Sequence, residues 1–471
     1  MRYHIVGLVD DDRAKHGLMI HGVKVLGGRE TIPAVVRAEN VDSIVIAIQT
    51  VSGQDLREIL SICMSTSASI KRLPGVFQRF EGSSEALPLR DLGIEDLVGR
   101  EQVSIDLQAC RQLLAGKTVL VTGAAGSVGS ELCRQIVQFQ PRLLVMLDQD
   151  ETGLHDLALD LRARLRGLGD ASAAASSEDA LSRCRYVLAD ITRRTRMQQV
   201  FRQYRPEIIL HSAAYKHVPL MEQFPEEALR VNVGGTLVLL DLARAFGSER
   251  FVFISTDKSV EPTCMLGVSK WMGEVLVTQL PRDGPPIATA VRFGNVLGSR
   301  GSVACIFQRQ IDAGGPVTVT HPAATRFFMS VSEAASMVLQ AASMAQGGEV
   351  FILEMGEQIR ISDLAHKMIR LHGLRVGQDI AVVHTDLRPG EKLHEKLVAD
   401  HEVARPTSHP EVLCVQGDGG ADREGLLEET NLLLQALDEG MPTADLRARL
   451  FELARAHGAH PAGDAARHQE A

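Results

Sequence analysis

Short apolar runs alternate with amphipathic stretches from residue 117 onward. The run 118–121 is β-branched and apolar and has the length of a strand, and residues 130–137 after it have helical spacing. Further strand-like runs lie at 143–148, 185–188, 208–210, 251–254 and 288–292. Strands that alternate with helices in this way predict an α/β fold, a doubly wound Rossmann parallel sheet.

The first 80 residues predict a small α/β unit of their own. Strand-like runs lie at 5–9, 23–27 and 43–48, and residues 54–65 have helical spacing. No glycine-rich loop follows the first run, so we expect a partial α/β domain that lacks its first strand–helix unit and binds no dinucleotide by itself.

The alternation weakens beyond residue 300, which predicts a small C-terminal substrate subdomain. We expect a helix over 332–345 with Ser332 at its N-cap, and a charged turn at 388–392 that leads into another helix. The expected domains are 1–80, a connector at 81–116, a catalytic region at 117–400, and a helical extension with a disordered tail at 401–471.

A glycine-rich loop follows the strand at 118–121 and opens a helix. Gly123 permits a tight turn, Gly126 lets a pyrophosphate approach the backbone, and Gly129 lets helix and strand pack closely. The helix N-terminus would face the phosphates with free N–H groups. An ordinary glycine-rich turn is the alternative, but the flanking strand and helix favour a dinucleotide site.

An acidic residue, Asp148, ends the second strand about 20 residues after the loop. A carboxylate there accepts hydrogen bonds from a ribose 2′-OH and repels a 2′-phosphate, so we expect NAD rather than NADP. Residues 149–151 include no arginine, which agrees. The alternative is that Asp148 caps the following helix, and both roles are compatible.

Composition narrows the class of protein. The net charge of −9 indicates no nucleic-acid partner, and no apolar run reaches the roughly 18 residues that span a bilayer. The seven cysteines lack metal-ligand spacing, which predicts no metal site and a reducing cytoplasm. We also see no signal peptide at the N-terminus.

Six stretches carry a resemblance to a known family: VTGAAGSVGSE at 121–131, HSAAYKHVPLMEQFPEEALRVNVGGT at 211–236, STDKSVEPTCMLGVSK at 255–270, RFGNVLGSRGSV at 292–303, GGPVTVTHPAATRFFMS at 314–330 and LRPGEKLHEKL at 387–397. The sequence resembles the extended short-chain dehydrogenases/reductases, and among them the CapD-like nucleotide-sugar 4,6-dehydratases of capsule and polysaccharide biosynthesis. Residues 1–80 resemble the later part of the CoA-binding-like domain that precedes the catalytic domain there.

The resemblance implies a lyase reaction, the loss of water across C5 and C6 of a UDP-N-acetylhexosamine. The expected substrate is UDP-N-acetylglucosamine, with retention of configuration and a 4-keto-6-deoxy product. NAD would take hydride from C4 and return it at C6. Asp257 matches the acid, if burial raises its pKa, and Lys258 matches the base, if its pKa is lowered. Because neighbouring side chains on a strand point apart, we expect the strand to end before this pair.

The resemblance also implies the remaining contacts. The expected cofactor ligands are Gly123, Ala125, Gly126, Ser127, Val128, Gly129, Asp148, Asp190, Ile191, Ala213, Ala214, Ser255 and Lys270. The expected substrate ligands are Lys216, Asn295, Arg300, Arg326, Arg388 and Glu391, with the arginines on phosphate and the glutamate on the uridine ribose.

One position departs from the superfamily pattern. Leu266 stands where the Tyr of Tyr-x-x-x-Lys is expected, four residues before Lys270. Thr256, or a water relayed to Lys270, would then deprotonate the C4 hydroxyl. Two other functions stay open: a sugar-nucleotide epimerase, which needs no Asp257–Lys258 pair, and a non-catalytic NAD-bound scaffold.

The resemblance further implies a homo-oligomer. We expect it in the cytoplasm, at the inner face of the membrane beside membrane-bound glycan assembly enzymes, with a UDP-sugar as its small-molecule partner.

Overall fold

The structure, a computed structural model, describes residues 4–48, 53–73, 90–91, 105–167, 178–416, 422–442 and 445–460. The chain forms two compact units. Unit 1 comprises 1–102, 301–323 and 359–385, and unit 2 comprises 103–300, 324–358 and 386–471. The domains expected from the sequence are continuous segments, whereas each unit combines three separate segments. The expected domain boundaries stay a prediction.

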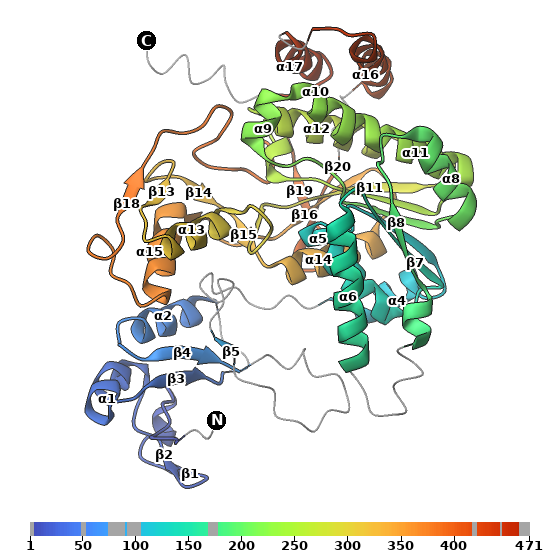
Figure 1. The fold of residues 1–471 in the computed structure, drawn as a ribbon. Helices are drawn as coiled ribbons and strands as arrows, with labels where there is room; N and C mark the ends of the chain where they lie inside the picture. The colour runs from blue at the N-terminus through green and yellow to red at the C-terminus, as the bar shows by residue number, and fades with distance from the viewer. Residues whose placement is uncertain are drawn as a thin grey trace. The chain divides into compact units, whose positions relative to one another are not determined.

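Unit 2 is built on one large sheet, a nine-stranded sheet among the described residues (Figure 1). Its strands, in spatial order, are β19 (Ala404–Pro406), β20 (Val412–Gln416), β16 (Glu349–Leu353), β11 (Ile287–Arg292), β10 (Arg250–Ile254), β9 (Ile208–His211), β6 (Thr118–Thr122), β7 (Leu143–Asp148) and β8 (Cys184–Leu188). The strands from β16 to β8 pair in parallel, and β20 and β19 pair antiparallel. The Rossmann prediction is confirmed.

Helices cover both faces of this sheet because alternate strand residues point to opposite sides (Figure 1). Val119 and Val121 pack with one set of helices, and Leu120 between them packs with the other. The first set is α4 (Leu107–Leu114), α5 (Ser127–Ile136), α6 (Glu151–Gly167) and α14 (Val331–Met344). The second is α8 (Arg194–Tyr204), α11 (Gly235–Phe246) and α12 (Met265–Thr278).

The sheet order reverses at β6, which lies between β7 and β9. Thr122 pairs with His211 at the carboxyl ends of β6 and β9. Ligands bind at such a switch point in open parallel sheets, because the loops that leave the two strands diverge there. The glycine-rich loop after β6 and residues 212–217 after β9 therefore lie at the same edge.

A third layer covers the outer side of α12. It comprises the π-helical η5 (Ala228–Gly234), α16 (Arg423–Asp438) and α17 (Leu446–Ala456), which share a buried apolar cluster with α12. The helices expected beyond 401 are therefore present, and the tail at 461–471 lies outside the described residues.

Unit 1 contains a three-stranded sheet of β3 (Ser43–Ile46), β4 (Ser69–Arg72) and β5 (Arg90–Asp91) in its described part. Helices α1 (Ile32–Glu39) and α2 (Gly53–Cys63) supply its core with β3. The expected strand at 5–9 is wrong, since only Leu8 bridges, to Val25. Unit 1 also holds α13 (Val303–Asp312), α15 (Ile361–Leu371), the hairpin of β1 (Met19–Ile20) and β2 (Val23–Lys24), and the parallel pair β13 (Val317–Val319) and β18 (Val382–His384).

Two local predictions are corrected in unit 2. Ser330, not Ser332, caps α14, because its side chain accepts from the Glu333 N–H while Glu333 reaches back in a capping box. The expected helix after 388–392 is wrong, since residues 391–400 form an irregular segment. This irregular segment brings several charged side chains into the site described below.

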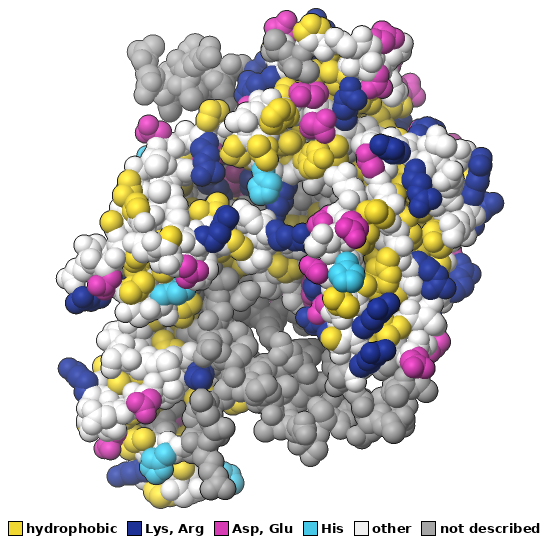
Figure 2. Space-filling view, viewed as in Figure 1, with side chains coloured by type: hydrophobic (Ala, Val, Ile, Leu, Met, Phe, Trp, Pro, Cys, Tyr) yellow, Lys and Arg dark blue, Asp and Glu magenta, His cyan; other side chains and the backbone are white. Residues whose placement is uncertain are grey.

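On the face drawn in Figure 2, Lys and Arg side chains are interspersed with Asp and Glu. Among the described residues, no helix is long and apolar enough to cross a membrane. In the same part of the chain, no cluster of His, Cys, Asp and Glu is arranged to hold a metal ion.

Replacing Gly129 by alanine should destabilise unit 2, because the new Cβ would lie 2.0 Å from the Gly123 carbonyl oxygen. Overpacking of this kind costs about 1–3 kcal/mol, so we expect a lower midpoint in thermal denaturation. Gly284→Ala is the matched control, since nothing lies within 4 Å of its Cβ position. Equal denaturation midpoints for Gly129→Ala and Gly284→Ala would contradict the close approach of residue 129 to the Gly123 carbonyl.

Candidate functional site

The glycine-rich loop has the backbone geometry that a dinucleotide requires. Gly123 has φ +68°, and a Cβ there would lie 2.6 Å from the Ala213 backbone nitrogen. Gly126 is exposed and begins α5 without a side-chain cap, so the first N–H groups of this helix face outward. Ser127 and Val128 follow in the first turn. A glycine-rich turn with small side chains at a helix N-terminus fits a pyrophosphate.

Asp148 supports this loop from the end of β7. Its Oδ2 accepts from the Ala125 N–H at 2.9 Å, and its Oδ1 accepts from the Asp150 N–H at 3.0 Å. Each carboxylate oxygen keeps a further lone pair, so a ribose hydroxyl is compatible with both bonds. Asp148 does not cap α6, because Asp150 does so by accepting from the Gly153 N–H at 2.9 Å.

Arg300, expected on the substrate phosphate, lies over the cofactor loop instead. Its backbone N–H donates to Ser127 Oγ at 3.0 Å, and its guanidinium pairs with Asp150 at 3.0 Å and donates to the Ala125 carbonyl. The other expected cofactor residues lie at the same sheet edge: Asp190 and Ile191 after β8, Ala213 and Ala214 after β9, and Ser255 after β10.

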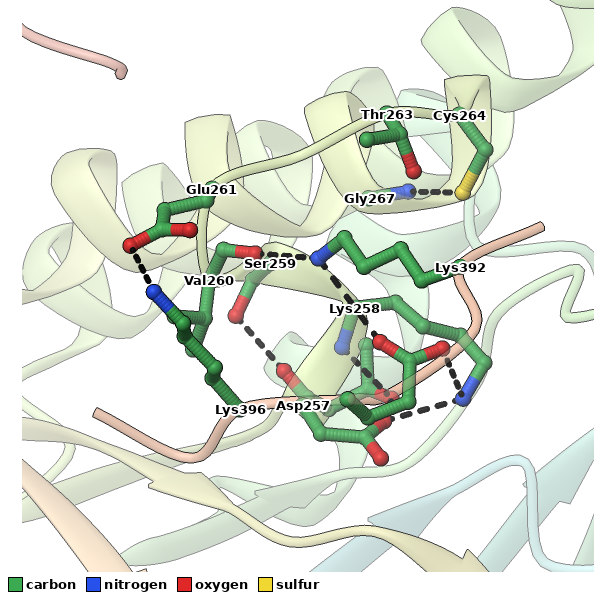
Figure 3. Close-up of polar contacts among 12 residues, drawn as sticks. Asp257, Lys258, Ser259, Val260, Glu261, Thr263, Cys264, Gly267, Lys392 and Lys396 are labelled. Carbon is green, nitrogen blue, oxygen red and sulfur yellow. Dashed lines mark hydrogen bonds and ion pairs between the residues drawn. The ribbon is translucent and has the colours of Figure 1, made fainter. Parts of the chain in front are cut away.

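The Asp257–Lys258 pair lies where β10 has ended, as expected. Residues Asp257–Ser259 form a single 3-10 turn, η6, which Thr256 caps (Figure 3). Because the backbone turns here, neighbouring side chains meet, and Lys258 Nζ donates to Asp257 Oδ1 at 2.9 Å. Thr256 donates to the same oxygen at 2.9 Å. Asp257 is buried, and its Oδ2 accepts no hydrogen bond from any described residue.

A base role for Lys258 requires a lowered pKa, but its surroundings raise the pKa. Burial by itself disfavours the ammonium ion, but Asp257 and Glu395 outweigh it and raise the pKa of Lys258. Lys258 Nζ also donates to Asn295 Oδ1 at 3.2 Å. The free protein therefore holds Lys258 as a cation, and a base role requires that its proton first moves to a neighbour.

Lys270 has the opposite environment. Its Nζ donates to the Ile254 carbonyl at 2.8 Å and lies 4.5 Å from the centre of the Phe253 ring. Burial lowers the pKa of Lys270 to about 7, against the opposing charge of Glu274. Leu266, one turn earlier on α12, is buried in the apolar cluster and supplies no polar atom.

A buried histidine, His211, adjoins the cofactor edge and was missed by sequence reasoning. It bonds Thr122 Oγ1 at 2.7 Å and Thr236 Oγ1 at 2.9 Å, between the rings of Phe251 and Phe253. Burial, with a smaller contribution from Lys270, lowers its pKa to about 3. It is therefore a neutral link between β9 and α11, and its place at the end of a predicted strand was the one available signal.

The expected substrate residues gather only in part. Asn295 contacts Lys258, and Lys216 donates to Ser299 Oγ at 3.4 Å. Arg326 is buried, and its guanidinium donates to Glu391 at 3.0 Å and to the backbone carbonyls of residues 325, 392 and 393. Arg326 therefore holds the irregular segment in place, whereas Arg388 is exposed.

A family model for polysaccharide biosynthesis proteins matches residues 119–417. The chain belongs to this family. It is 39% identical over 448 residues to the probable polysaccharide biosynthesis protein EpsC of Bacillus subtilis, covering 95% of this chain and 71% of the relative. It is 40% identical over 441 residues to the capsular polysaccharide biosynthesis protein CapD of Staphylococcus aureus, covering 93% and 70%.

A more distant relative is the UDP-N-acetylglucosamine 4,6-dehydratase (inverting) of Campylobacter jejuni. It is 26% identical over 291 residues, which cover 61% of this chain and 78% of the relative. The family match and these relatives together support a role as a sugar-nucleotide dehydratase or epimerase for this member of the polysaccharide biosynthesis family.

Beneath η6, the turn that carries Asp257 and Lys258, lies a buried ion pair that sequence reasoning also missed. Arg292 pairs with Glu274 at 2.7 Å and with Glu402 at 2.8 Å. Ser259, on η6, donates to Glu274 at 2.7 Å. Despite burial, Arg292 lowers the pKa of Glu402, so both carboxylates face a permanent cation. Glu274 lies four residues after Lys270 on α12, and this spacing was the sequence signal that both side chains lie on the same face of the helix.

Replacing Arg292 by methionine should lower the free energy of unfolding by about 3–5 kcal/mol, because the buried Glu274 and the partly buried Glu402 lose their cation. Chemical denaturation followed by circular dichroism measures this. Lys396→Met is the control, since that lysine is 45% exposed and its pairs are worth less than about 1 kcal/mol. A loss no larger than in the control would show that the buried pair is dispensable.

Proposed function

We propose that the chain is an NAD-dependent dehydratase that removes water across C5 and C6 of a UDP-N-acetylhexosamine, UDP-N-acetylglucosamine above all. The observation that carries the proposal is the 2.9 Å contact between the buried Asp257 and Lys258 at the carboxyl edge of β10. An epimerase would have no use for an acid and a base beside each other here. The name of the Campylobacter relative supports the same substrate.

The acid and the base can exchange the proton that the reaction needs. Lys258 transfers its proton to Asp257 along their hydrogen bond, which leaves a neutral amine and a carboxylic acid. The amine takes the proton from C5, and the acid protonates the departing C6 hydroxyl, which leaves as water. The ammonium and the carboxylate are restored at that point. When the hydride returns at C6, the Lys258 ammonium gives a proton back to C5, and the proton that left the C4 hydroxyl replaces it, so the acid–base groups end as they began.

The cofactor residues fit NAD at the switch point. When bound, the nicotinamide would accept a hydride from C4 and return it at C6, which acidifies C5–H. The loop 123–129 would hold the pyrophosphate, and Asp148 would hold the adenosine ribose. Lys270 has a pKa of about 7, and its Nζ lies at the Ile254 carbonyl at the end of β10, so it is our candidate to accept the C4 hydroxyl proton in place of the missing tyrosine.

The pathway context is also a proposal. Membership of a polysaccharide biosynthesis family supports a product destined for surface glycans. A homo-oligomer and an association with membrane-bound glycan assembly enzymes stay predictions.

The protein should bind NAD more tightly than NADP, because a 2′-phosphate would meet the carboxylate of Asp148. Isothermal titration calorimetry of both cofactors measures the preference. Asp148→Ala should lose most affinity for NAD, since it removes both the ribose acceptor and the support of the Ala125 N–H. Equal affinity of the unmodified protein for the two cofactors would sink the assignment.

Asp257→Asn should abolish dehydration while substrate binding persists, since a positioned acid or base contributes about 10²–10⁴ in rate. Mass spectrometry of the sugar nucleotide detects the loss of water, and Lys258→Ala should also stop exchange of the C5 hydrogen with D₂O. Leu266→Ala is the control and should cost far less.

Three outcomes would separate the functions. Loss of water supports the dehydratase, an isomer of unchanged mass supports an epimerase, and an unchanged substrate supports a scaffold. Full turnover by Asp257→Asn would show that the acid–base pair is wrongly assigned.

A further inference from the structure

Besides Asp257, a second carboxylate, Glu395, lies beside Lys258. Its side chain is 3% exposed, and its Oε1 is 3.6 Å from Lys258 Nζ and 3.9 Å from Arg326 Nε. Its Oε2 is 3.6 Å from Lys392 Nζ and accepts no hydrogen bond from any residue that the structure describes. Burying a charge with so few hydrogen bonds is costly, so the position calls for a functional reason.

The charges around Glu395 balance. Glu395 contacts three cations, which are Lys258, Arg326 and Lys392. Two further carboxylates complete the group: Asp257 pairs with Lys258, and Glu391 pairs with Arg326. Lys392 also donates to the Val260 carbonyl at 2.6 Å, on the loop after the catalytic turn (Figure 3). Glu395 is the one anion in this described group that touches all three cations.

The ammonium of Lys258 is therefore held by two carboxylates from different parts of the chain. Asp257 comes from the same turn, whereas Glu395 comes from the irregular segment 391–400. Lysine is a flexible chain with a strongly hydrated point charge, and a nearby diphosphate would attract it. A second anion on the protein opposes that attraction.

We propose that Glu395 is the positioning residue of the acid–base pair: it holds the Lys258 ammonium at Asp257 and away from the diphosphate of a nucleotide sugar. The inference rests on the proposed function for its purpose, but the contact itself exists in the free protein. Glu395 does not touch the reacting carbons in this scheme and acts through Lys258.

The groups that act on Lys258 are known from its surroundings. Asp257 and Glu395 favour its charged form, and burial and Arg326 oppose it. Cys264 lies near both Lys258 and Glu395, but burial raises its thiol pKa to about 11, so it stays neutral at physiological pH. Removing the charge of Glu395 should therefore let Lys258 lose its proton at lower pH.

The experiment titrates Lys258 in the full-length free protein by NMR of ¹³Cε-labelled lysine, with the signal assigned by its absence in Lys258→Met. Glu395→Gln keeps the size of the side chain and removes its charge. We expect the Lys258 signal to titrate at least about one pH unit lower than in the unmodified protein. Glu395→Asp keeps the charge and should restore most of the difference.

Glu261→Gln is the matched control, because Glu261 pairs with Lys396 at 3.1 Å and, among the described residues, makes no ion pair with Lys258, Arg326 or Lys392. Its Lys258 signal should titrate as in the unmodified protein. An unchanged titration in Glu395→Gln would overturn the inference. If Glu395→Gln does not fold, Glu395→Met takes its place, since it also removes the charge, and an unchanged Lys258 titration in that variant would overturn the inference.

A second measurement separates this inference from the proposed function. The rate of C5 hydrogen exchange with D₂O in UDP-N-acetylglucosamine should reach its plateau at lower pH in Glu395→Gln, and the KM should fall, because a Lys258 ammonium released toward the diphosphate adds an attractive contact to the substrate. A shifted NMR titration with no exchange in any variant would refute the proposed function and leave the positioning of Lys258 intact. Hydrogen exchange at C5 together with an unshifted NMR titration would support the proposed function and refute the positioning of Lys258 by Glu395.

Discussion

The ion pair of Arg292 with Glu274 and Glu402 is the constraint on which the rest of the site depends. It joins β11, α12 and the chain after residue 397 inside the protein, where Arg292 also donates to the Leu397 carbonyl at 2.9 Å. Ser259 connects the catalytic turn to the same carboxylate. Because a buried charge without its partner is so unfavourable, these segments have only one way to pack together.

This anchoring explains how the side chains of two neighbouring residues, Asp257 and Lys258, come into contact. Gly267 lets the first turn of α12 approach the catalytic turn, since a Cβ there would lie 2.3 Å from the Lys258 carbonyl oxygen. The turn therefore stays against α12, and Ser259 bonds Glu274 on that helix. The helix that carries Lys270 and the turn that carries Asp257 and Lys258 are positioned as one body.

The two lysines of the site, Lys258 and Lys270, differ in pKa because their environments differ. Lys258 lies among carboxylates, which keep its pKa raised, and Lys270 lies against an aromatic ring and a carbonyl, so burial lowers its pKa to about 7. One lysine is therefore held as a cation beside an acid, and the other is close to neutral at physiological pH. Such divergence suits a reaction with two separate proton transfers.

The sequence by itself determined the parts that depend on local chemistry. The six strands β6 to β11, the glycine loop and the end of β10 before Asp257 follow from patterns within a few residues, because strand periodicity and glycine conformations are local properties. Tertiary structure alone decided the roles of Arg300, Glu395 and Arg292. Arg300 contacts the cofactor loop from 150 residues further along the chain than Asp150, and the segment of Glu395 is irregular where a helix was predicted. Charged groups far apart in the chain acquire their partners, and hence their protonation, only when folding removes them from water.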